Sequence, residues 1–512
     1  MLGFDPGHAR PSRRRALGAL SSAVGGSLLC VACAVGPNFK HPEPPRAARL
    51  SVQPLPARTV ATDAAGGAAQ RFVAGERIPA QWWTLFHSPP LDALIEQALA
   101  ANPTVQSAQA ALRQAHENFL ADRGVLAPSV DLTANGARER ISGAEFGEPG
   151  EAFMYNLFNA SVNVSYALDV FGGARRELEA LRAQTSYQRY ALEATYLTLA
   201  ANVVTSAITE ASLRAQIEAT EQLVEASSRR LEVVERQQRL GGASGADVLA
   251  QRTELAQDRA SLPGLRDQLD RQRSLLASLL GRLPSDQPQA TFRLADLELP
   301  ESVPVSLPSQ LVSQRPDVQE QQELLHQASA QVGVATANLL PQLTLSASYG
   351  GTATQSSALF ESASRIWSAG AGITQPLFHG GQLLHQRRAA IAAYDEAAAQ
   401  YRGTVLTAFR NVADSLHALV ADAETFSAQN EAEQSAADDL ALTDRQYALG
   451  AVSFLTLLNA QRAERQARLL LIQARAARLA DTAALIQALG GGWWNRGATR
   501  LPPSGPASVQ MP

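Results

Sequence analysis

The stretch Ser161–Gly173, Ser-Val-Asn-Val-Ser-Tyr-Ala-Leu-Asp-Val-Phe-Gly-Gly, decides the fold of this 512-residue chain. Apolar and polar residues alternate along it, which predicts a β-strand with one apolar and one polar face. Val130–Asn135 alternates in the same way, so the two segments are expected to pair as a hairpin. No proline or glycine then occurs from Ala174 to Leu240. This run predicts a helix about 100 Å long, since an α-helix rises about 1.5 Å per residue.

The same order of elements occurs a second time. Alternation returns at Leu343–Tyr349 and Trp367–Thr374, and a long helix is expected at Gln382–Leu449. The punctuating residues keep their spacing: Pro103 and Pro128 are 25 residues apart, as are Pro316 and Pro341, and Gly241 and Gly281 are 40 apart, as are Gly450 and Gly490. Such self-similarity predicts a molecule built from two structural repeats.

The repeats set the expected domain boundaries. We expect a signal peptide at 1–32, an N-terminal arm with an equatorial region at 33–90, and a linker that also belongs to the equatorial region at 284–308. The first repeat (91–283) contains a helix over Leu91–Leu126, a β-hairpin at 128–171 and a helical hairpin at 174–281. The second repeat (309–492) contains a helix over Arg315–Leu340, a β-hairpin at 341–379 and a helical hairpin at 382–490. A disordered, proline-rich tail is expected at 493–512.

Composition excludes several classes of function. Lys+Arg 44 against Asp+Glu 48 gives no basic surplus for nucleic acid. Lys40 is the only lysine, so the body of the chain has no P-loop lysine. The two cysteines, Cys30 and Cys33, lie at the N-terminus, and the histidines form no H-E-x-x-H pattern. We therefore expect no catalytic residues, no metal site and no cofactor, and hence no enzyme.

The N-terminus has the features of an export signal. Arg13–Arg15 is a basic region, and the apolar stretch Ala16–Ala32 is too short for a membrane-spanning helix. The ending Val31-Ala32-Cys33 resembles a bacterial lipoprotein box, with Cys33 as the lipidated residue. Alanine, not aspartate, follows the cysteine, and by resemblance to lipoprotein sorting rules this favours the outer membrane. An ordinary cleaved signal or a twin-arginine signal are the alternatives.

The predicted hairpins point to a membrane barrel shared between chains. Four strands cannot close a barrel, for which about eight are the minimum. An open sheet edge is not tolerated in lipid, where each unpaired backbone group costs several kcal/mol. Three chains would together supply twelve strands, within the range of membrane barrels. The long helices are rich in Ala, Gln, Glu and Arg, which suits the wall of a water-filled tube better than a solid bundle. A solvated coiled coil is the alternative for these helices.

Several motifs in order resemble one family. They are Cys33–Phe39, Trp82-Trp83, Arg315–Val318, Leu340-Pro341, Gln375–Phe378 and Ala488–Trp493. Together they resemble the TolC-type outer-membrane efflux factors, and most closely the NodT-like lipoproteins of RND drug pumps.

The resemblance implies a mainly α-helical fold with a membrane β-barrel. A homotrimer would form a twelve-stranded outer-membrane barrel on a long periplasmic α-helical barrel, with a mixed α/β belt around its middle. The implied partners are further copies of the chain, outer-membrane lipid, a periplasmic membrane-fusion adaptor and an inner-membrane RND transporter. The implied activity is passive export of drugs or other small molecules, with the pump supplying the energy.

The two turns between the long helices match the family's periplasmic tip. Gly241 and Gly450 suit a chain reversal, and Ser244 and Ser453 could cap the returning helices. The resemblance implies that the adaptor contacts these turns. It also implies a ring of aspartates in the pore, whereas this chain has Asn459 at the corresponding position. We therefore expect Leu455, Leu458 and Asn459 to close the pore, with Asp247 as a second candidate; the alternatives are simple caps and a solvated helix charge.

Other readings remain open at this point. A channel for type I protein secretion is the alternative within the same fold, although members with that role mostly lack a lipoprotein signal. A periplasmic coiled-coil structural or adaptor lipoprotein is the alternative from a different class, but adaptors carry one helical hairpin where this sequence predicts two.

Overall fold

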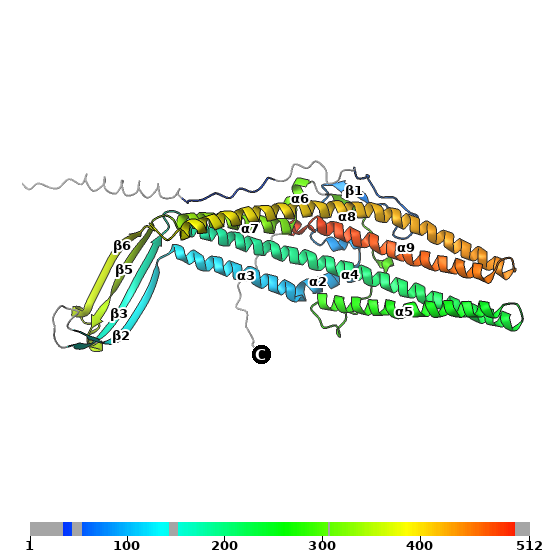
Figure 1. Cartoon of the computed structure of the whole chain (residues 1–512), viewed down its shortest axis with the longest axis horizontal. Helices are drawn as coiled ribbons and strands as arrows, with labels where there is room; N and C mark the ends of the chain where they lie inside the picture. The colour runs from blue at the N-terminus through cyan, green and yellow to red at the C-terminus, as the bar shows by residue number, and fades with distance from the viewer. Residues whose placement is uncertain (1–33, 44–53, 143–151, 306–307, 497–512) are drawn as a thin grey trace, which may run out of the picture. The chain divides into compact units, whose positions relative to one another are not determined.

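The computed structural model describes residues 34–43, 54–142, 152–305 and 308–496. The chain divides into two compact units. Figure 1 shows the helices and strands of both, coloured along the sequence. The first comprises Met1–His41, Gln114–Ser186 and Glu323–Ala399; the second comprises Pro42–Arg113, Tyr187–Gln322 and Gln400–Pro512. Each unit therefore combines matching segments of the two sequence repeats.

The first unit is built on a four-stranded antiparallel sheet in which both predicted hairpins pair side by side. The strands are ordered β2 (Ser129–Ile141), β3 (Phe153–Leu168), β5 (Gln342–Ala353) and β6 (Arg365–Thr374). Among the described residues, β2 and β6 each leave one edge without a partner strand. The sheet is therefore open at both ends within one chain.

One face of this sheet is apolar and uncovered. The strand register brings Leu132, Val162, Tyr349 and Trp367 into one row across all four strands. Their exposed fractions are 76%, 41%, 59% and 76%, so no described part of the chain covers this row. Thr133 and Ser161 form a pair on the opposite face, where their hydroxyl oxygens lie 3.0 Å apart. The predicted division into an apolar and a polar face is confirmed.

The long helices confirm the internal repeat. α4 (Gly173–Arg239) and α8 (Gln382–Ala448) each have 67 residues. The returning helices α5 (Gly245–Leu279) and α9 (Phe454–Ala488) each have 35. Two side-chain carboxyl oxygens of Asp169 accept hydrogen bonds from the backbone N–H groups of Ala174 and Arg175, which fixes the start of α4.

The single helix expected over Leu91–Leu126 is wrong. The structure has α2 (Pro89–Ala101) and α3 (Pro103–Arg123), separated at Asn102. Proline disfavours helical geometry in the residue before it, and the Asn102 side chain then accepts a hydrogen bond from the N–H of Thr104 at 2.8 Å. The second repeat breaks in the same way before Pro316, between α6 (Pro308–Gln314) and α7 (Pro316–Ala337). The helix expected over Arg315–Leu340 thus corresponds to α7, which ends three residues earlier than predicted.

The second unit has the main hydrophobic core, formed where the arm, the linker and the C-terminal end meet. β1 (Arg71–Ala74) of the arm pairs in parallel with β4 (Ser302–Val305) of the linker. Trp82 and Phe86 of the short helix η2 (Trp82–Phe86) are 1% and 0% exposed. α4 contributes Val203 to this core. It is the one helix among the described residues that is long and apolar enough to cross a membrane, and 44% of that apolar window is buried within the chain.

The expected tail differs in its first residues. Trp493–Asn495 forms the short helix η8, and the indole N–H of Trp493 donates to the carbonyl oxygen of Gln314 at 2.7 Å. Order therefore extends past the predicted boundary at 493, while 497–512 lie outside the described residues. The remaining short helices are η3 (Gly124–Leu126), η5 (Leu294–Asp296), η6 (Ser356–Ala358) and η7 (Ser362–Ser364).

Candidate functional site: the turns between the long helices

The turn between α4 and α5 is a glycine-terminated helix end. Gly241 has φ +79°, a left-handed conformation that costs little only in glycine. The N–H of Gly242 donates to the carbonyl oxygen of Gln237 at 2.8 Å, and that of Gly241 donates to Gln238 at 3.0 Å. These bonds satisfy carbonyl groups that the end of a helix leaves free.

The start of α5 is held by a reciprocal cap. The Ser244 hydroxyl accepts a hydrogen bond from the N–H of Asp247 at 3.2 Å, and the Asp247 carboxylate accepts one from the N–H of Ser244 at 2.9 Å. The Ser244 hydroxyl also donates to this carboxylate at 2.8 Å. Asp247, a candidate for the gate, is thus engaged in capping, where a negative charge is favourable at a helix N-terminus.

The turn between α8 and α9 repeats the construction. Gly450 has φ +74°, and the N–H of Ala451 donates to the carbonyl oxygen of Gln446 at 2.9 Å. The Ser453 hydroxyl accepts a hydrogen bond from the N–H of Thr456 at 3.2 Å, which caps α9. The leucine before each glycine, Leu240 and Leu449, is 82% and 85% exposed. Each turn therefore presents a rigid reversal with one apolar side chain directed to solvent.

The helices of the two repeats meet just behind the turns. Val234, Val248, Phe454 and Leu457 form a small buried cluster, one or more from each of α4, α5 and α9. The ring of Tyr447 on α8 packs edge-on against Phe454, with ring centroids 5.7 Å apart. This cluster couples the position of one turn to that of the other.

Two polar links join α4 and α8 at the same level, and no local sequence pattern predicts either of them. The Arg230 guanidinium lies 2.8 Å from the Asp444 carboxylate, and the Tyr447 hydroxyl donates to the Gln237 side chain at 3.3 Å. Burial raises the pKa of Tyr447, and the nearby Asp247 carboxylate adds to the shift. The phenol therefore stays protonated and remains a hydrogen-bond donor.

The expected gate residues separate into two groups. Leu455 is 62% exposed, and Asn459, one helical turn later, is also exposed. Leu458 is only 3% exposed because it packs within the chain. Among the three residues of α9, Leu455 and Asn459 thus share an accessible face, and Leu458 does not.

A buried charged cluster links α5 and α9 farther from the turns. Glu254 and Asp258 have side chains 2% and 3% exposed. Arg462 lies 2.7 Å from the Glu254 carboxylate, and Arg465 pairs with both acids. Ser227 of α4 donates to the remaining oxygen of Asp258 at 2.7 Å. Sequence reasoning missed this cluster, because its members show no local spacing motif.

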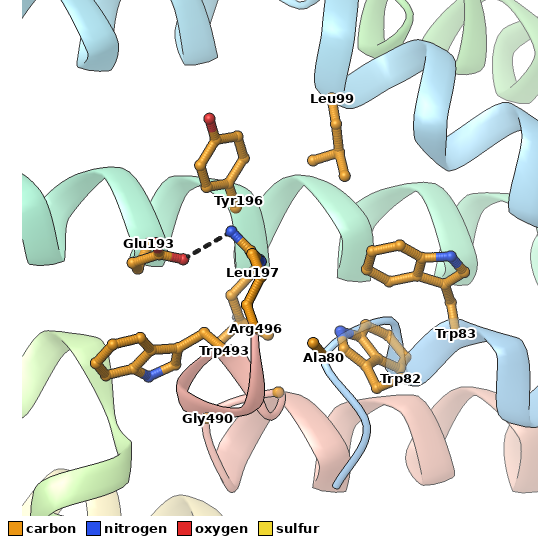
Figure 2. Close-up of a pocket in the computed structure, with 11 residues that line it drawn as sticks. Ala80, Trp82, Trp83, Leu99, Glu193, Tyr196, Leu197, Gly490, Trp493 and Arg496 are labelled. Carbon is orange, nitrogen blue, oxygen red and sulfur yellow. Dashed lines mark hydrogen bonds and ion pairs between the residues drawn. The ribbon is translucent and has the colours of Figure 1, made fainter. Parts of the chain in front are cut away.

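A shallow cleft in the second unit has an aromatic wall but no reactive group in evidence. Figure 2 shows Arg496 reaching Glu193, at a distance of 3.0 Å, beside Tyr196. The Arg496 guanidinium lies 5.2 Å from the centre of the Tyr196 ring. Gly491 lies so close that an added Cβ would meet Leu197 at 2.3 Å. Gly491, Trp493 and Arg496 of the C-terminal segment thus form part of the wall of this cleft. In the described part of the chain, no group of three or more His, Cys, Asp or Glu side chains could hold a metal ion.

Comparison with known proteins places this geometry in context. A family model described as outer membrane efflux protein matches residues 94–282 and 307–491. The pyoverdine export outer membrane protein OpmQ of Pseudomonas aeruginosa is 33% identical over 439 residues, covering 83% of this chain and 90% of OpmQ. The probable efflux pump outer membrane protein TtgC of Pseudomonas putida is 31% identical over 467 residues, covering 91% of this chain and 93% of TtgC. The solved structure of the outer-membrane channel OprN has a TM-score of 0.80 and 26% identity, covering 90% of this chain and 100% of OprN.

Proposed function

The chain belongs to the outer membrane efflux protein family, and from this premise we propose that it is the passive, trimeric channel of a tripartite efflux system. It has the fold of TolC-like outer-membrane channels, and its family is one of channels, not of enzymes. The observation that carries the proposal is the open four-stranded sheet with an uncovered apolar face.

A trimer would both pair the free edges of the sheet and place its apolar face against lipid. The free edges of β2 and β6 expose unpaired backbone groups, which lipid does not tolerate. Pairing β6 of one copy with β2 of the next, three times around, gives a closed twelve-stranded barrel. The row from Leu132 to Trp367 would then face lipid, and the polar face would line water.

The helical turns are the proposed site for the adaptor. Gly241 and Gly450 hold Leu240 and Leu449 outward on two structurally equivalent reversals, with Ser244 and Ser453 as caps. A trimer would present six such leucines in a ring, which suits a repeating apolar contact with the tips of a periplasmic membrane-fusion adaptor. An inner-membrane RND transporter would supply the cargo and the energy through that adaptor.

Closure of the proposed pore rests on the exposed face of α9. Leu455 and Asn459 are accessible, so three copies of each could meet around the axis. Leu458 supports the helix from behind, and Asp247 contributes through its cap on α5 and not as a free charge.

The proposed location is the outer membrane, with the helices in the periplasm and a lipid anchor on Cys33. Cys33 lies outside the described residues, and the proposal rests on the lipoprotein-like sequence around it. Two or three acyl chains hold a protein firmly, because each buried methylene contributes about 0.8 kcal/mol.

The proposal is tested with the full-length protein in a host that lacks its own efflux channels. Outer-membrane extracts should contain a heat-modifiable trimer, the purified trimer should conduct ions across a planar bilayer, and co-expression with a cognate adaptor and pump should restore resistance to small toxic compounds. A monomer without conductance would contradict the channel. A conducting trimer that exports a protein substrate but no small molecule would favour the type I secretion alternative instead.

The adaptor site is tested separately by charge at the turns. Leu240→Asp combined with Leu449→Asp should abolish co-purification with the adaptor while leaving the trimer and its conductance intact. Leu283→Asp is the matched control, since Leu283 is also exposed, at 72%, but lies just past the other end of α5, away from both turns. Unchanged adaptor binding in the double variant would remove the turns from the interface.

A further inference from the structure

The segment that directly follows Cys33 is bound to the first unit along its length. The N–H of Val35 donates to the carbonyl oxygen of Phe171 at 3.0 Å. Phe171 lies in the short connection between β3 and α4. Ala34 lies against Gly172, where an added Cβ would be 2.7 Å from the Ala34 Cα. The arm therefore begins at the junction between the sheet and the long helix.

A buried arginine donates hydrogen bonds to this segment. Arg176 of α4 is 4% exposed. Its guanidinium donates to the carbonyl oxygen of Val35 at 3.1 Å, to the side-chain oxygen of Asn38 at 2.7 Å and to the carboxylate of Glu179 at 2.7 Å. Hydrogen bonds from a charged donor are worth more than neutral ones, and a buried guanidinium left without them would be costly. The arginine thus depends on the segment as much as the segment depends on it.

Two glycines allow the backbones to touch. An added Cβ on Gly36, which has φ +94°, would lie 2.4 Å from the Cα of Gly333 on α7. An added Cβ on Gly333 would lie 2.8 Å from the Cγ of Arg176. Both contacts are closer than real Cβ atoms come, so a side chain at Gly36 would clash with the backbone of α7, and one at Gly333 would displace the Arg176 side chain that binds the segment. The segment therefore packs closely against the helices and does not make a loose surface contact.

The far end of the segment is held by an aromatic stack. The Phe39 ring lies on the His326 ring, with centroids 4.3 Å apart and planes 14° from parallel. His326 on α7 is in turn held by Glu179 at 3.0 Å and by Glu323 at 3.5 Å. Phe39 also packs edge-on against His41, at 5.3 Å. Helices α4 and α7, one from each repeat, therefore both contribute to the site.

We propose that Val35–Phe39 is a docking segment that fixes the lipidated N-terminus beside the base of the sheet, through Arg176, Gly333 and His326. Cys33 directly precedes Ala34 in the sequence, and Ala34 lies against Gly172. The acyl chains and the sheet would then enter the membrane as one unit. This inference rests on the lipid anchor proposed above, but the docking itself can be measured without it.

Lys40 offers a direct test. It is the only lysine in the chain, so a lysine-specific protease has one cleavage site, one residue beyond Phe39. In the intact trimer the docked segment should resist cleavage, because proteases need several residues of extended, released chain. We expect Gly333→Ala to accelerate release of the Cys33–Lys40 fragment at least tenfold, relative to cleavage of the denatured chain. Asn38→Ala, which removes one Arg176 contact from the segment side and leaves every helix residue unchanged, should accelerate it more modestly.

The matched control is Gly403→Ala. Gly403 is also in a helix, α8, but an added Cβ there would meet nothing within 4 Å. Its cleavage rate should equal that of the unmodified protein. Equal rates in Gly333→Ala and the unmodified protein would overturn the docking. The mass of the released fragment reports separately whether Cys33 is acylated, so loss of the anchor and loss of docking are told apart.

A pH profile adds a second readout. Hydrogen bonding to Glu323, then to Glu179, raises the pKa of His326 against the opposing effect of burial. The folded pKa lies above the unfolded value, so the stabilisation is complete below the unfolded pKa and is lost as pH rises through the folded one. Normalised cleavage at Lys40 should increase over that range, and His326→Gln should abolish the increase. A pH-independent rate in the unmodified protein would exclude this role of His326.

Discussion

Arg465 on α9 and Glu254 on α5 are joined by a hydrogen-bonded ion pair of 2.6 Å, although 211 residues separate them in the chain. The Glu254 side chain is 2% exposed, and the same arginine also neutralises the buried Asp258. Both buried acids lie on α5, and the arginines that neutralise their charge lie on α9 of the other repeat. This pairing fixes how the two helical hairpins fit together.

Removing that arginine should destabilise the protein strongly. Among the described residues, Arg465→Met leaves the buried Asp258 carboxylate with only the Ser227 hydroxyl as a partner, and breaking a buried pair in this way costs about 3–5 kcal/mol. Arg266→Met is the control, because Arg266 and Glu221 are 58% and 50% exposed and such a surface pair contributes less than about 1 kcal/mol. Chemical unfolding of the purified protein in detergent measures both. Equal losses in the two variants would contradict the importance of burial.

Loosening the link between α4 and α8 should open the proposed pore. Arg230→Met removes the pair with Asp444 and should raise the mean single-channel conductance, because the turn of one repeat is then less tightly held to the other. Arg229→Met is a closely matched control, since the ion pair of the neighbouring Arg229 is with Glu225 of the same helix. Bilayer recordings decide between them. An increase in both variants would point to a general charge effect, and an increase in neither would remove the link from gating.

Charge at the proposed gate should create cation sensitivity. In a trimer, Asn459→Asp would place three carboxylates close together, and such a cluster binds cations where amides do not. Multivalent cations should then block the conductance of Asn459→Asp but not that of the unmodified protein or of Asn459→Gln. Conductance of Asn459→Asp that does not respond to cations would show that this residue does not line the constriction.

The pair Asp422 and Asp481 should make stability depend on pH. Burial, together with hydrogen bonding to Asp481 and its charge, raises the pKa of Asp422 to about 7, from 3.8. Between these values the folded state holds a proton that the unfolded state has lost, so the free energy of unfolding falls as pH rises from about 4 to about 7. Asp422→Asn imitates the protonated form. We expect it to raise the melting temperature at pH 8 and leave it nearly unchanged at pH 4, and a uniform shift at both pH values would contradict the assignment.

Much of the fold follows from local patterns in the sequence. The alternation in Ser161–Leu168 predicted both the strand and its apolar face. Gly241 and Gly450, which occupy the same position in the two repeats, predicted two equivalent turns. Ser244 and Ser453 cap the helices as expected. These features depend on residues only a few positions apart, so local sequence patterns predict them.

The break at Asn102 also has a local signal. Asn102-Pro103 marks the start of a helical pattern, since proline restricts the residue before it, whereas the apolar periodicity of Leu91–Leu99 by itself predicts a helix that continues across this point. The burial of Leu458 was a different case. Leu458 lies in the same short segment as Leu455 and Asn459, so the local sequence does not predict which of the three is buried. Only the packing of α9 against the other helices buries Leu458 and leaves the other two exposed.

The sequence by itself determined the two repeats, the strands with their apolar face, the long helices and the turns that end them, because backbone preference and hydrophobic periodicity act over short distances along the chain. Only the tertiary structure decided which charges are buried together and where the N-terminal segment docks. Arg465 meets Glu254, and Arg176 meets Val35, across more than a hundred residues of chain. Such contacts depend on how whole helices pack, and that packing brings together groups whose proximity no local pattern records.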